Sequence, residues 1–309
     1  MHRPAFPRKA ISPQTANALP IVALLCGNLA LAFGPWFVRL TDVGPVAAGF
    51  WRIALAAPVL VALSFAGQRK PFAAARGLWL AIALGGISFA ADLASWHLGI
   101  LRTTLANATL FGNSATLMFP IYGFFVARTW PSKTQGLALA LAAAGAALLL
   151  GRSFQLSPKH LAGDLLCLLA GTLYTVYFVL MAKARAAMAP IPTLALSTLA
   201  SVLPLLVAAL LLGEKILPQH WGILIGLALA SQVVGQGLMI YAIGHLSPLI
   251  VGIALLTQPV IAGTVGWIAY GERLGVADFI GAILVAIALV LVRSGGPRVA
   301  PEADGSKPA

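Results

Sequence analysis

The sequence predicts an all-α polytopic membrane protein with ten transmembrane helices. Three observations lead to this prediction: the composition, the length of the apolar runs, and the distribution of charge between their connections. Of the 309 residues, 60% are hydrophobic and only 9% are charged, whereas soluble domains carry about 25% charged residues. So few charges cannot cover a water-soluble surface, and the mean hydropathy of +0.94 agrees with a chain surrounded by lipid.

Ten apolar runs are long enough to cross a bilayer. A spanning helix needs about 20 mostly apolar residues, and only helices or closed barrels satisfy their backbone groups in hydrocarbon. The runs do not alternate every second residue, as barrel strands would, so helices are predicted. The predicted helices are Leu19–Leu40, Val46–Ala66, Gly77–Leu98, Thr104–Val126, Thr134–Leu150, Leu161–Ala182, Thr193–Leu212, Trp221–Ile243, Leu249–Tyr270 and Val276–Val292. Short connections with Gly and Pro separate these runs, so neighbouring helices are expected to be antiparallel.

The basic residues predict the orientation of these helices. With both termini in the cytoplasm, the inner side holds 13 Lys and Arg residues and the outer side holds 7. An excess of Lys and Arg marks cytoplasmic loops, so the count supports an even number of helices with both termini inside. The outer group consists of Arg39, Arg52, Arg102, Arg152, Lys159, Lys215 and Arg273.

Composition also excludes several classes of function. The net charge of +12 comes from scattered basic residues without the stripe that a nucleic-acid backbone needs. Cys26 and Cys167 lie inside apolar runs, without disulfide or metal-ligand spacing. The sequence has no Walker-type phosphate loop, so it is not expected to be an ATP-driven pump by itself. It also has no His/Glu pair with metal-ligand spacing and no serine-protease arrangement inside the apolar runs, so no metal, cofactor or enzymatic reaction is predicted. The first apolar run lacks a small-residue cleavage pattern and is predicted to be a retained helix.

Related stretches occur in the two halves of the chain. The second half contains Tyr241–Pro248, then Gln258–Val260, then Gly271–Leu274. The matching part of the first half contains Asp92–His97, Ala106–Leu110 and Asn113. When the two halves are aligned with Thr116 opposite Pro259, the Gly-Glu-Arg motif at 271–273 corresponds to residues 128–130. Those residues are Arg-Thr-Trp, so the first half lacks the acidic residue of the motif. The pattern resembles EamA-type members of the drug/metabolite transporter superfamily over Leu19 to Val292.

This resemblance implies two five-helix repeats of opposite orientation, because an odd number of helices makes the second copy enter from the other side. The implied organisation is a cytoplasmic tail at 1–18, a first repeat at 19–151, a second repeat at 161–293 and a cytoplasmic tail at 294–309. The family's activity implies secondary transport by alternating access, with export as the direction.

Polar side chains inside apolar runs are candidates for function, because each is costly to place in hydrocarbon. Asp92 lies deep within its predicted helix, where a bare charge costs about 2.5–3.5 kcal/mol to insert. It is either a proton-coupling carboxylate facing a watery cavity or a structural partner of Arg52 or His97. Trp96 follows one turn later on the same face and lines the cavity or belongs to the interfacial aromatic belt. His97 is the second proton-coupling candidate, or a hydrogen-bonded residue at the helix end.

Amide and phenol side chains complete the predicted cavity at mid-depth. Gln232 and Gln236 are four residues apart and share a helix face, while Pro259 breaks its helix by removing a backbone N–H. A helix break beside polar groups suits a binding site between repeats. For any single glutamine, a helix–helix hydrogen bond is the alternative. The residues predicted to bind substrate or line the cavity are Asn28, Asp92, Trp96, Asn113, Tyr174, Gln232, Gln236 and Gln258.

The predicted function is secondary transport of a small metabolite across the bacterial cytoplasmic membrane. An amino acid, another zwitterion, or an aromatic or amphipathic compound suits a cavity of amides and rings with one acid. An intramembrane lipid-modifying enzyme and a non-transporting structural or sensory protein are the alternatives. The predicted partners are the lipid bilayer and the small-molecule substrate, with protons as the candidate coupling ion and no nucleic acid. A monomer and a homodimer both remain open.

Overall fold

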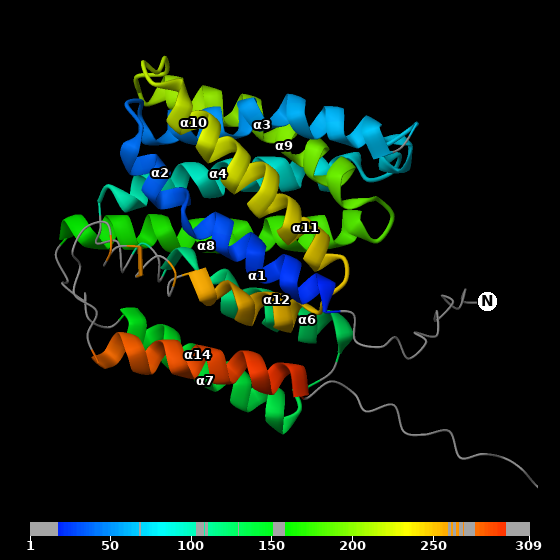
Figure 1. The fold of residues 1–309 in the computed structure, drawn as a ribbon, viewed down its shortest axis with the longest axis vertical. Coiled ribbons are helices and arrows are strands. Elements are labelled where there is room, and N and C mark those ends of the chain that lie inside the picture. The colour runs from blue at the N-terminus through cyan, green and yellow to red at the C-terminus, as the bar shows by residue number, and fades with distance from the viewer. Residues whose placement is uncertain are drawn as a thin grey trace, which may run out of the picture.

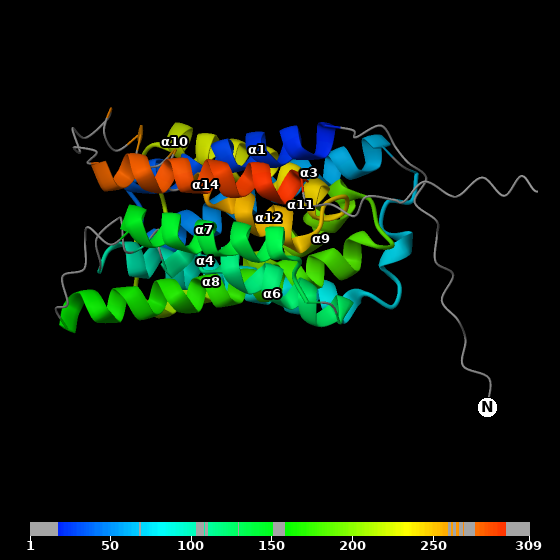
Figure 2. The same ribbon diagram turned by 90° about the horizontal axis from the view of Figure 1, so that it is seen from below.

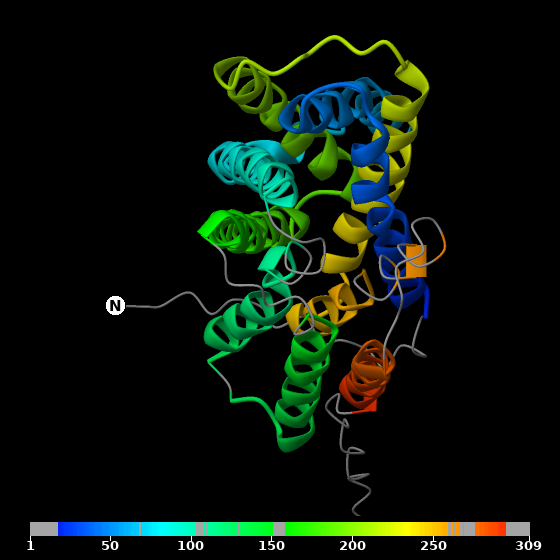
Figure 3. The same ribbon diagram turned by 90° about the vertical axis from the view of Figure 1, so that its left-hand side faces the viewer.

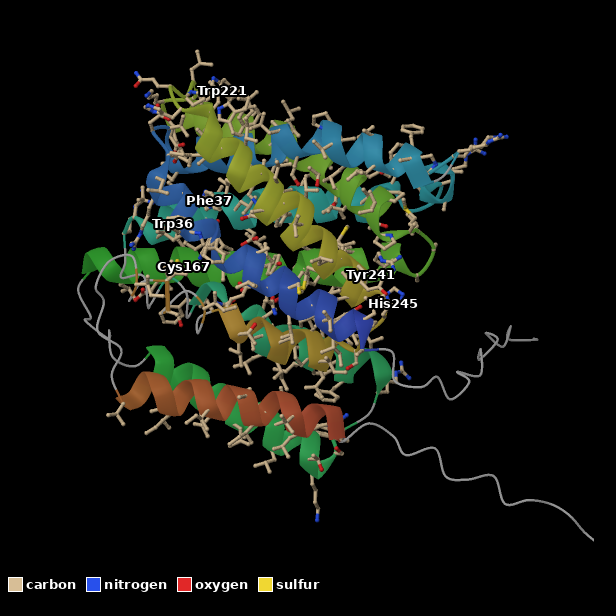
Figure 4. All side chains as sticks on the ribbon, in the orientation of Figure 1. Trp36, Phe37, Cys167, Trp221, Tyr241 and His245 are labelled. Carbon is tan, nitrogen blue, oxygen red and sulfur yellow. The ribbon has the colours of Figure 1, made fainter. Side chains whose placement is uncertain are left out.

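The described part of the protein is entirely helical, as predicted. The computed structural model describes residues 18–67, 69–102, 108, 111–128, 130–150, 158–258, 261, 264–265, 268 and 276–294. Their helices lie side by side in one elongated bundle (Figure 1), seen from below in Figure 2 and roughly along the helices in Figure 3. Figure 4 labels Trp221 near one end of the bundle and Tyr241 toward the other. We name these the Trp221 end and the Tyr241 end.

The helices follow the predicted runs closely. The first half contains α1 (Leu19–Ala32), α2 (Gly34–Leu40), α3 (Pro45–Gly67), the short 3-10 helix η1 (Ala73–Ala75), α4 (Trp79–Ile100), α6 (Ala115–Ala127) and α7 (Lys133–Leu150). The second half contains α8 (Pro158–Arg185), α9 (Pro190–Leu211), α10 (Trp221–Leu227), the π-helix η3 (Ala228–Gly235), α11 (Gln236–Ile243), α12 (Pro248–Leu255) and α14 (Val276–Ser294).

Six helical spans among the described residues are long and apolar enough to cross a membrane. They are Leu19–Leu40, Pro45–Gly67, Trp79–Ile100, Leu161–Arg185, Pro190–Leu211 and Trp221–Ile243. Each coincides with a predicted run. Helices α6, α7, α12 and α14 occupy the other four predicted runs, although their described residues do not meet the same criteria.

The first predicted helix is interrupted rather than continuous. Helix α1 ends at Ala32, Phe33 forms a turn, and α2 begins at Gly34. Pro35 occupies the first turn of α2, where the missing N–H of proline is tolerated. In the middle of a continuous helix, the same proline would remove a hydrogen bond and clash with the preceding turn. The Gly34-Pro35 step therefore explains why one apolar run contains two helices.

Two further interruptions occupy equivalent places in the two halves. Asn113 and Ser114 form a turn before α6, and Leu256 forms a turn after α12. The alignment that sets Thr116 opposite Pro259 also sets Asn113 opposite Leu256. Corresponding helices of the two halves are therefore broken at the same register.

The pairing of helices has an internal symmetry. Helix α4 packs extensively against α8, and the segment formed by η3 and α11 packs in the corresponding way against α1. Helices α3 and α9 pack together, as do α6 with α12 and α7 with α14. Figure 1 shows α7 and α14 side by side at the edge of the bundle farthest from α3 and α10. Each helix of the first half therefore has neighbours equivalent to those of its counterpart in the second half.

Contacts at the Trp221 end fix the first turns of α3. The Glu214 carboxylate accepts hydrogen bonds from the backbone N–H groups of Val46 (3.3 Å) and Ala47 (2.8 Å). A carboxylate at a helix N-terminus pairs with exposed N–H groups and with the positive end of the helix dipole. Trp51 Nε1 also donates to the carbonyl of Ile216 at 2.7 Å. The loop before α10 thus holds the part of α3 that faces the cavity described below.

Helices α6 and α12 approach so closely that a small residue is required between them. A Cβ added to Gly252 would lie 2.4 Å from Cγ of Pro120 and 2.6 Å from the carbonyl oxygen of Thr116. Neither group can move cheaply, so Gly252→Ala is expected to destabilise the protein by about 1–3 kcal/mol. Gly136→Ala is the matched control, because a Cβ there meets nothing within 4 Å. Thermal unfolding in detergent should show a lower Tm for the first variant only, and equal Tm values would contradict this packing.

Candidate functional site

A cavity with two charged side chains in its wall lies between helices from both halves of the chain. Its volume, measured as the space open to the centre of a water molecule, is about 80 Å³. One water needs roughly 10–15 Å³ of such volume, so the cavity has room for several waters or for part of a small ligand. The lining residues are Leu31, Ala32, Pro35, Arg52, Phe89, Asp92, Leu93, Trp96, Gly112, Asn113, Tyr174 and Gln258.

One cation and one anion face each other across this cavity. Arg52 on α3 is 4% exposed and Asp92 on α4 is 9% exposed, and the two side chains interact electrostatically. No described side chain lies within hydrogen-bond or ion-pair distance of the Asp92 carboxylate. Both groups therefore remain available to a ligand that carries opposite charges.

The burial of Arg52 corrects the predicted charge distribution. Arg52 was predicted to lie on the outer side of the membrane, yet it lies two turns inside α3 and lines the cavity. Its guanidinium carbon is 5.8 Å from the centroid of the Phe89 ring. An arginine over an aromatic face gains a cation–π interaction. This interaction partly offsets the free-energy cost of removing water from the buried guanidinium.

Gln232 stands behind Arg52 rather than in the cavity wall. Its Oε1 accepts a hydrogen bond from Arg52 Nε at 3.2 Å, and its Nε2 donates to Thr198 Oγ1 at 3.0 Å. Gln232 is completely buried within the π-helix η3. Both ends of the amide are thereby used, so its orientation is fixed.

Two other buried amides support lining residues in the same way. Gln236 Oε1 accepts a hydrogen bond from the Tyr174 hydroxyl at 3.2 Å. Asn28 Oδ1 accepts one from Gln258 Nε2 at 2.9 Å, while Asn28 Nδ2 donates to the carbonyl of Ala254 at 2.7 Å. Asn28 and Gln236 are both fully buried. Three of the five amides predicted as cavity residues, Asn28, Gln232 and Gln236, are therefore supports for residues that touch the cavity.

His97 does not line the cavity. Its Nδ1 donates a hydrogen bond to the Pro45 carbonyl at 2.6 Å, and its ring is 1% exposed. A Cβ on Gly49 would lie 3.4 Å from the His97 ring, so α3 packs directly against it. This geometry matches the structural alternative for His97, a hydrogen-bonded residue near a helix end.

A layer of aromatic rings lies beside the cavity, toward the Tyr241 end. The Phe89 and Tyr177 rings stack with centroids 4.6 Å apart, and the Tyr174 and Phe178 centroids are 4.2 Å apart. Tyr177 and Phe178 are fully buried, as is Met181 one turn beyond. We call Phe89, Tyr174, Tyr177 and Phe178 the aromatic layer. The cavity residues on α4 lie on its Trp221 side.

The structure thus divides the predicted site residues into two groups. The cavity wall holds Asp92, Trp96, Asn113, Tyr174 and Gln258. The supporting positions hold Asn28, Gln232 and Gln236. Pro259 lies outside the described residues, as do Asn107 and the 271–274 step.

Arg52 and Phe89 line the cavity but are not among the predicted site residues. For Arg52, the sequence contains a signal. Its position inside the predicted Val46–Ala66 helix was the available signal, because a charge placed there must face a partner or a wet cavity. Among the described residues, no group of three or more His, Cys, Asp or Glu side chains could hold a metal ion.

A comparison with the sequence models of known families identifies one family. Residues 18–151 and 161–294 each match the sequence model of the EamA-like transporter family. An uncharacterized transporter of Archaeoglobus fulgidus is 29% identical over 151 residues, which cover 47% of this chain and 50% of that protein. The chain thus matches about half the length of that relative. A solved crystal structure of a protein shares the fold, with a TM-score of 0.72 and 18% identity over 93% of this chain and all of the other.

Proposed function

The chain belongs to the EamA-like transporter family, and from this premise we propose that it is a secondary transporter that carries a small metabolite across the bacterial cytoplasmic membrane by alternating access. The observation that carries the proposal is the cavity, in which a buried cation and a buried anion face aromatic walls contributed by both halves. Charged groups inside a membrane protein mark substrate or ion pathways.

The proposed architecture has ten transmembrane helices in two inverted repeats. The equivalent helix pairs and the interruptions at Asn113 and Leu256 support it. Inverted repeats place the substrate site at their interface, where broken helices supply polar groups. Rocking of one half against the other would then expose the cavity to each side of the membrane in turn.

Labelling from outside the cell tests the proposed orientation. Lys215 precedes α10 at the Trp221 end and Lys133 begins α7. We expect Lys215→Cys to react with an impermeant maleimide on intact cells, and Lys133→Cys to react only after permeabilisation. Cys26 and Cys167 would first be replaced by alanine. If both positions reacted from the same side, the ten-helix topology and its inversion would be wrong.

The substrate class follows from the charges in the cavity. Arg52 can bind a carboxylate through two parallel hydrogen bonds, and Asp92 can pair with an ammonium group. The rings of Phe89, Trp96 and Tyr174 provide an apolar wall. We therefore propose an amino acid or another small zwitterion with an aromatic or amphipathic body. Export is the proposed direction, by analogy with the family.

Proton coupling is assigned to Asp92 alone. Its carboxylate lines the cavity, and no described side chain lies within hydrogen-bond or ion-pair distance of it, so protonation there can change with substrate occupancy. His97 was the other candidate, but its ring is sealed against Pro45 and Gly49. The coupling proposal therefore depends on one residue.

Counterflow in proteoliposomes tests the function directly. A thermal-shift screen of the purified protein against a metabolite panel would first identify ligands. Each ligand would then be tested for saturable exchange across the vesicle membrane. Exchange is the expected result, and its absence for every stabilising ligand would favour a structural or sensory protein. Chemical turnover of a ligand in detergent, where no gradient exists, would instead favour the intramembrane enzyme.

A further inference from the structure

Arg52 uses only part of its guanidinium to contact protein. Its Nε donates to Gln232 Oε1, and among the described residues the two terminal nitrogens make no hydrogen bond. An arginine has five N–H donors in a rigid fork. The two terminal nitrogens form one of the edges through which a guanidinium can bind a carboxylate in a parallel pair. The hydrogen bond to Gln232 occupies Nε and leaves this terminal edge free.

Gln232 can orient Arg52 because its own position is rigid. It lies in the π-helix η3, and its Nε2 is held by Thr198 on α9. π-Helical turns are rare and occur often at functional sites. Behind η3, Gly235 packs so closely on α1 that a Cβ would lie 2.9 Å from Cγ of Leu31. Leu31 lines the cavity. Helix η3 therefore packs against the cavity wall and also contains Gln232, the residue that holds Arg52.

We propose that Gln232 is a positioning residue that presents the terminal nitrogens of Arg52 to the cavity without neutralising their charge, and thereby makes the site select substrates that carry a carboxylate. This inference deepens the proposed transport function and rests on it. A neutral amide accepts the Nε hydrogen bond without offsetting the guanidinium charge. A carboxylate at the same position would form an ion pair with Arg52 and leave Asp92 as the uncompensated charge of the cavity.

Gln232→Glu tests the proposal with little change in shape. The hydroxyl of Thr198 now accepts a hydrogen bond from Gln232, and a hydroxyl can donate instead. The network can therefore accommodate glutamate without leaving a buried polar atom unpaired. Its effect should be electrostatic, and an unchanged thermal stability in detergent would verify that the variant folds.

Three probes with the same ring separate the charges that the site recognises. Phenylalanine carries both charges, 3-phenylpropanoate carries only the carboxylate, and phenethylammonium carries only the ammonium group. We expect Gln232→Glu to weaken binding of the first two by about 10-fold or more, and to strengthen or preserve binding of the third. A purely structural role would weaken all three equally, and that result would overturn the proposal.

A double-mutant cycle tests whether Gln232 acts through Arg52. Gln232→Met should weaken phenylalanine binding in the wild-type background but have little further effect when Arg52→Gln is already present. Gln236→Met is the matched control, because Gln236 is equally buried yet supports Tyr174. Its effect should add to that of Arg52→Gln. Additive effects for Gln232 as well would overturn the positioning role.

The outcomes also separate this inference from the transport proposal. A wild-type protein that binds none of the three probes would overturn carboxylate selection by Arg52. Saturable counterflow of any other metabolite would still support a transporter in that case. The opposite outcome is also distinguishable. If no ligand showed counterflow but probe binding responded to Gln232→Glu as expected, the carboxylate-selective site would be supported and the transport proposal would be contradicted.

Discussion

Asp92→Asn is expected to abolish the response of transport to pH and to weaken substrate binding by about 10-fold or more, since hydrogen bonds to charged groups contribute about 1.5–3 kcal/mol. Asparagine has nearly the same shape but can neither bind a proton nor balance the charge of Arg52. In the wild-type protein, Asp92 lines the cavity and no described side chain is close enough to pair with its carboxylate. Its protonation is therefore free to follow pH and substrate.

The measurement is the initial rate of counterflow or uptake in proteoliposomes between about pH 5 and about pH 8. The wild-type rate should change over this range, whereas the rate of the variant should be low and flat. Asp304→Asn removes an acid from the predicted C-terminal tail and serves as the control for loss of one negative charge. A variant that transports at the wild-type rate across the whole range would refute proton coupling at Asp92.

Arg52→Gln is expected to weaken binding of a carboxylate-bearing substrate by roughly 10- to 150-fold, the equivalent of about 1.5–3 kcal/mol for hydrogen bonds to a charged group. Glutamine removes the cation and also deprives Gln232 of its donor. The cavity then keeps Asp92 alone, so the preference should move from zwitterions toward cations.

Equilibrium binding in detergent would measure this change, with Kd values for a zwitterion and for its amine analogue. Arg102→Gln is the matched control, because Arg102 is exposed just beyond α4 and donates to the Leu98 carbonyl at 3.3 Å, outside the cavity lining. The Kd of Arg52→Lys for the zwitterion should lie between those of the wild type and of Arg52→Gln, since lysine keeps the charge but loses the planar fork. Equal Kd values for the Arg52→Gln variant and the wild type would remove Arg52 from the site.

Hydropathy was sufficient to predict where helices form, because long apolar runs have few alternatives in a bilayer. It could not predict how one run is divided. The Gly34-Pro35 step was visible in the sequence, yet only the folded chain reveals that α1 and α2 separate there. The π-helix at Gln232 leaves no comparable sequence signal, since its extra residue per turn depends on packing against other helices.

The candidate site was predicted in part for a related reason. Intramembrane polarity identified Asp92 and Gln258 as candidates, and both line the cavity. The same criterion could not distinguish a wall residue from its support, because the Asn28–Gln258 hydrogen bond joins residues 230 positions apart. Arg52 was missed for a different reason. Counting charges assigns every arginine to a loop on one side of the membrane, whereas Arg52 lies within a helix and faces an internal cavity.

The aromatic layer has a practical consequence for inhibition. Because Phe89, Tyr174, Tyr177 and Phe178 pack on the Tyr241 side of the cavity, Arg52 and Asp92 lie toward the end that the proposed orientation turns to the cell exterior. In the outward-open state of the proposed cycle, a polar blocker too hydrophilic to enter cells would therefore reach these two charges without an uptake route. Such a compound would also trap the carrier with its entrance on that face occupied, so halting every later step of the cycle.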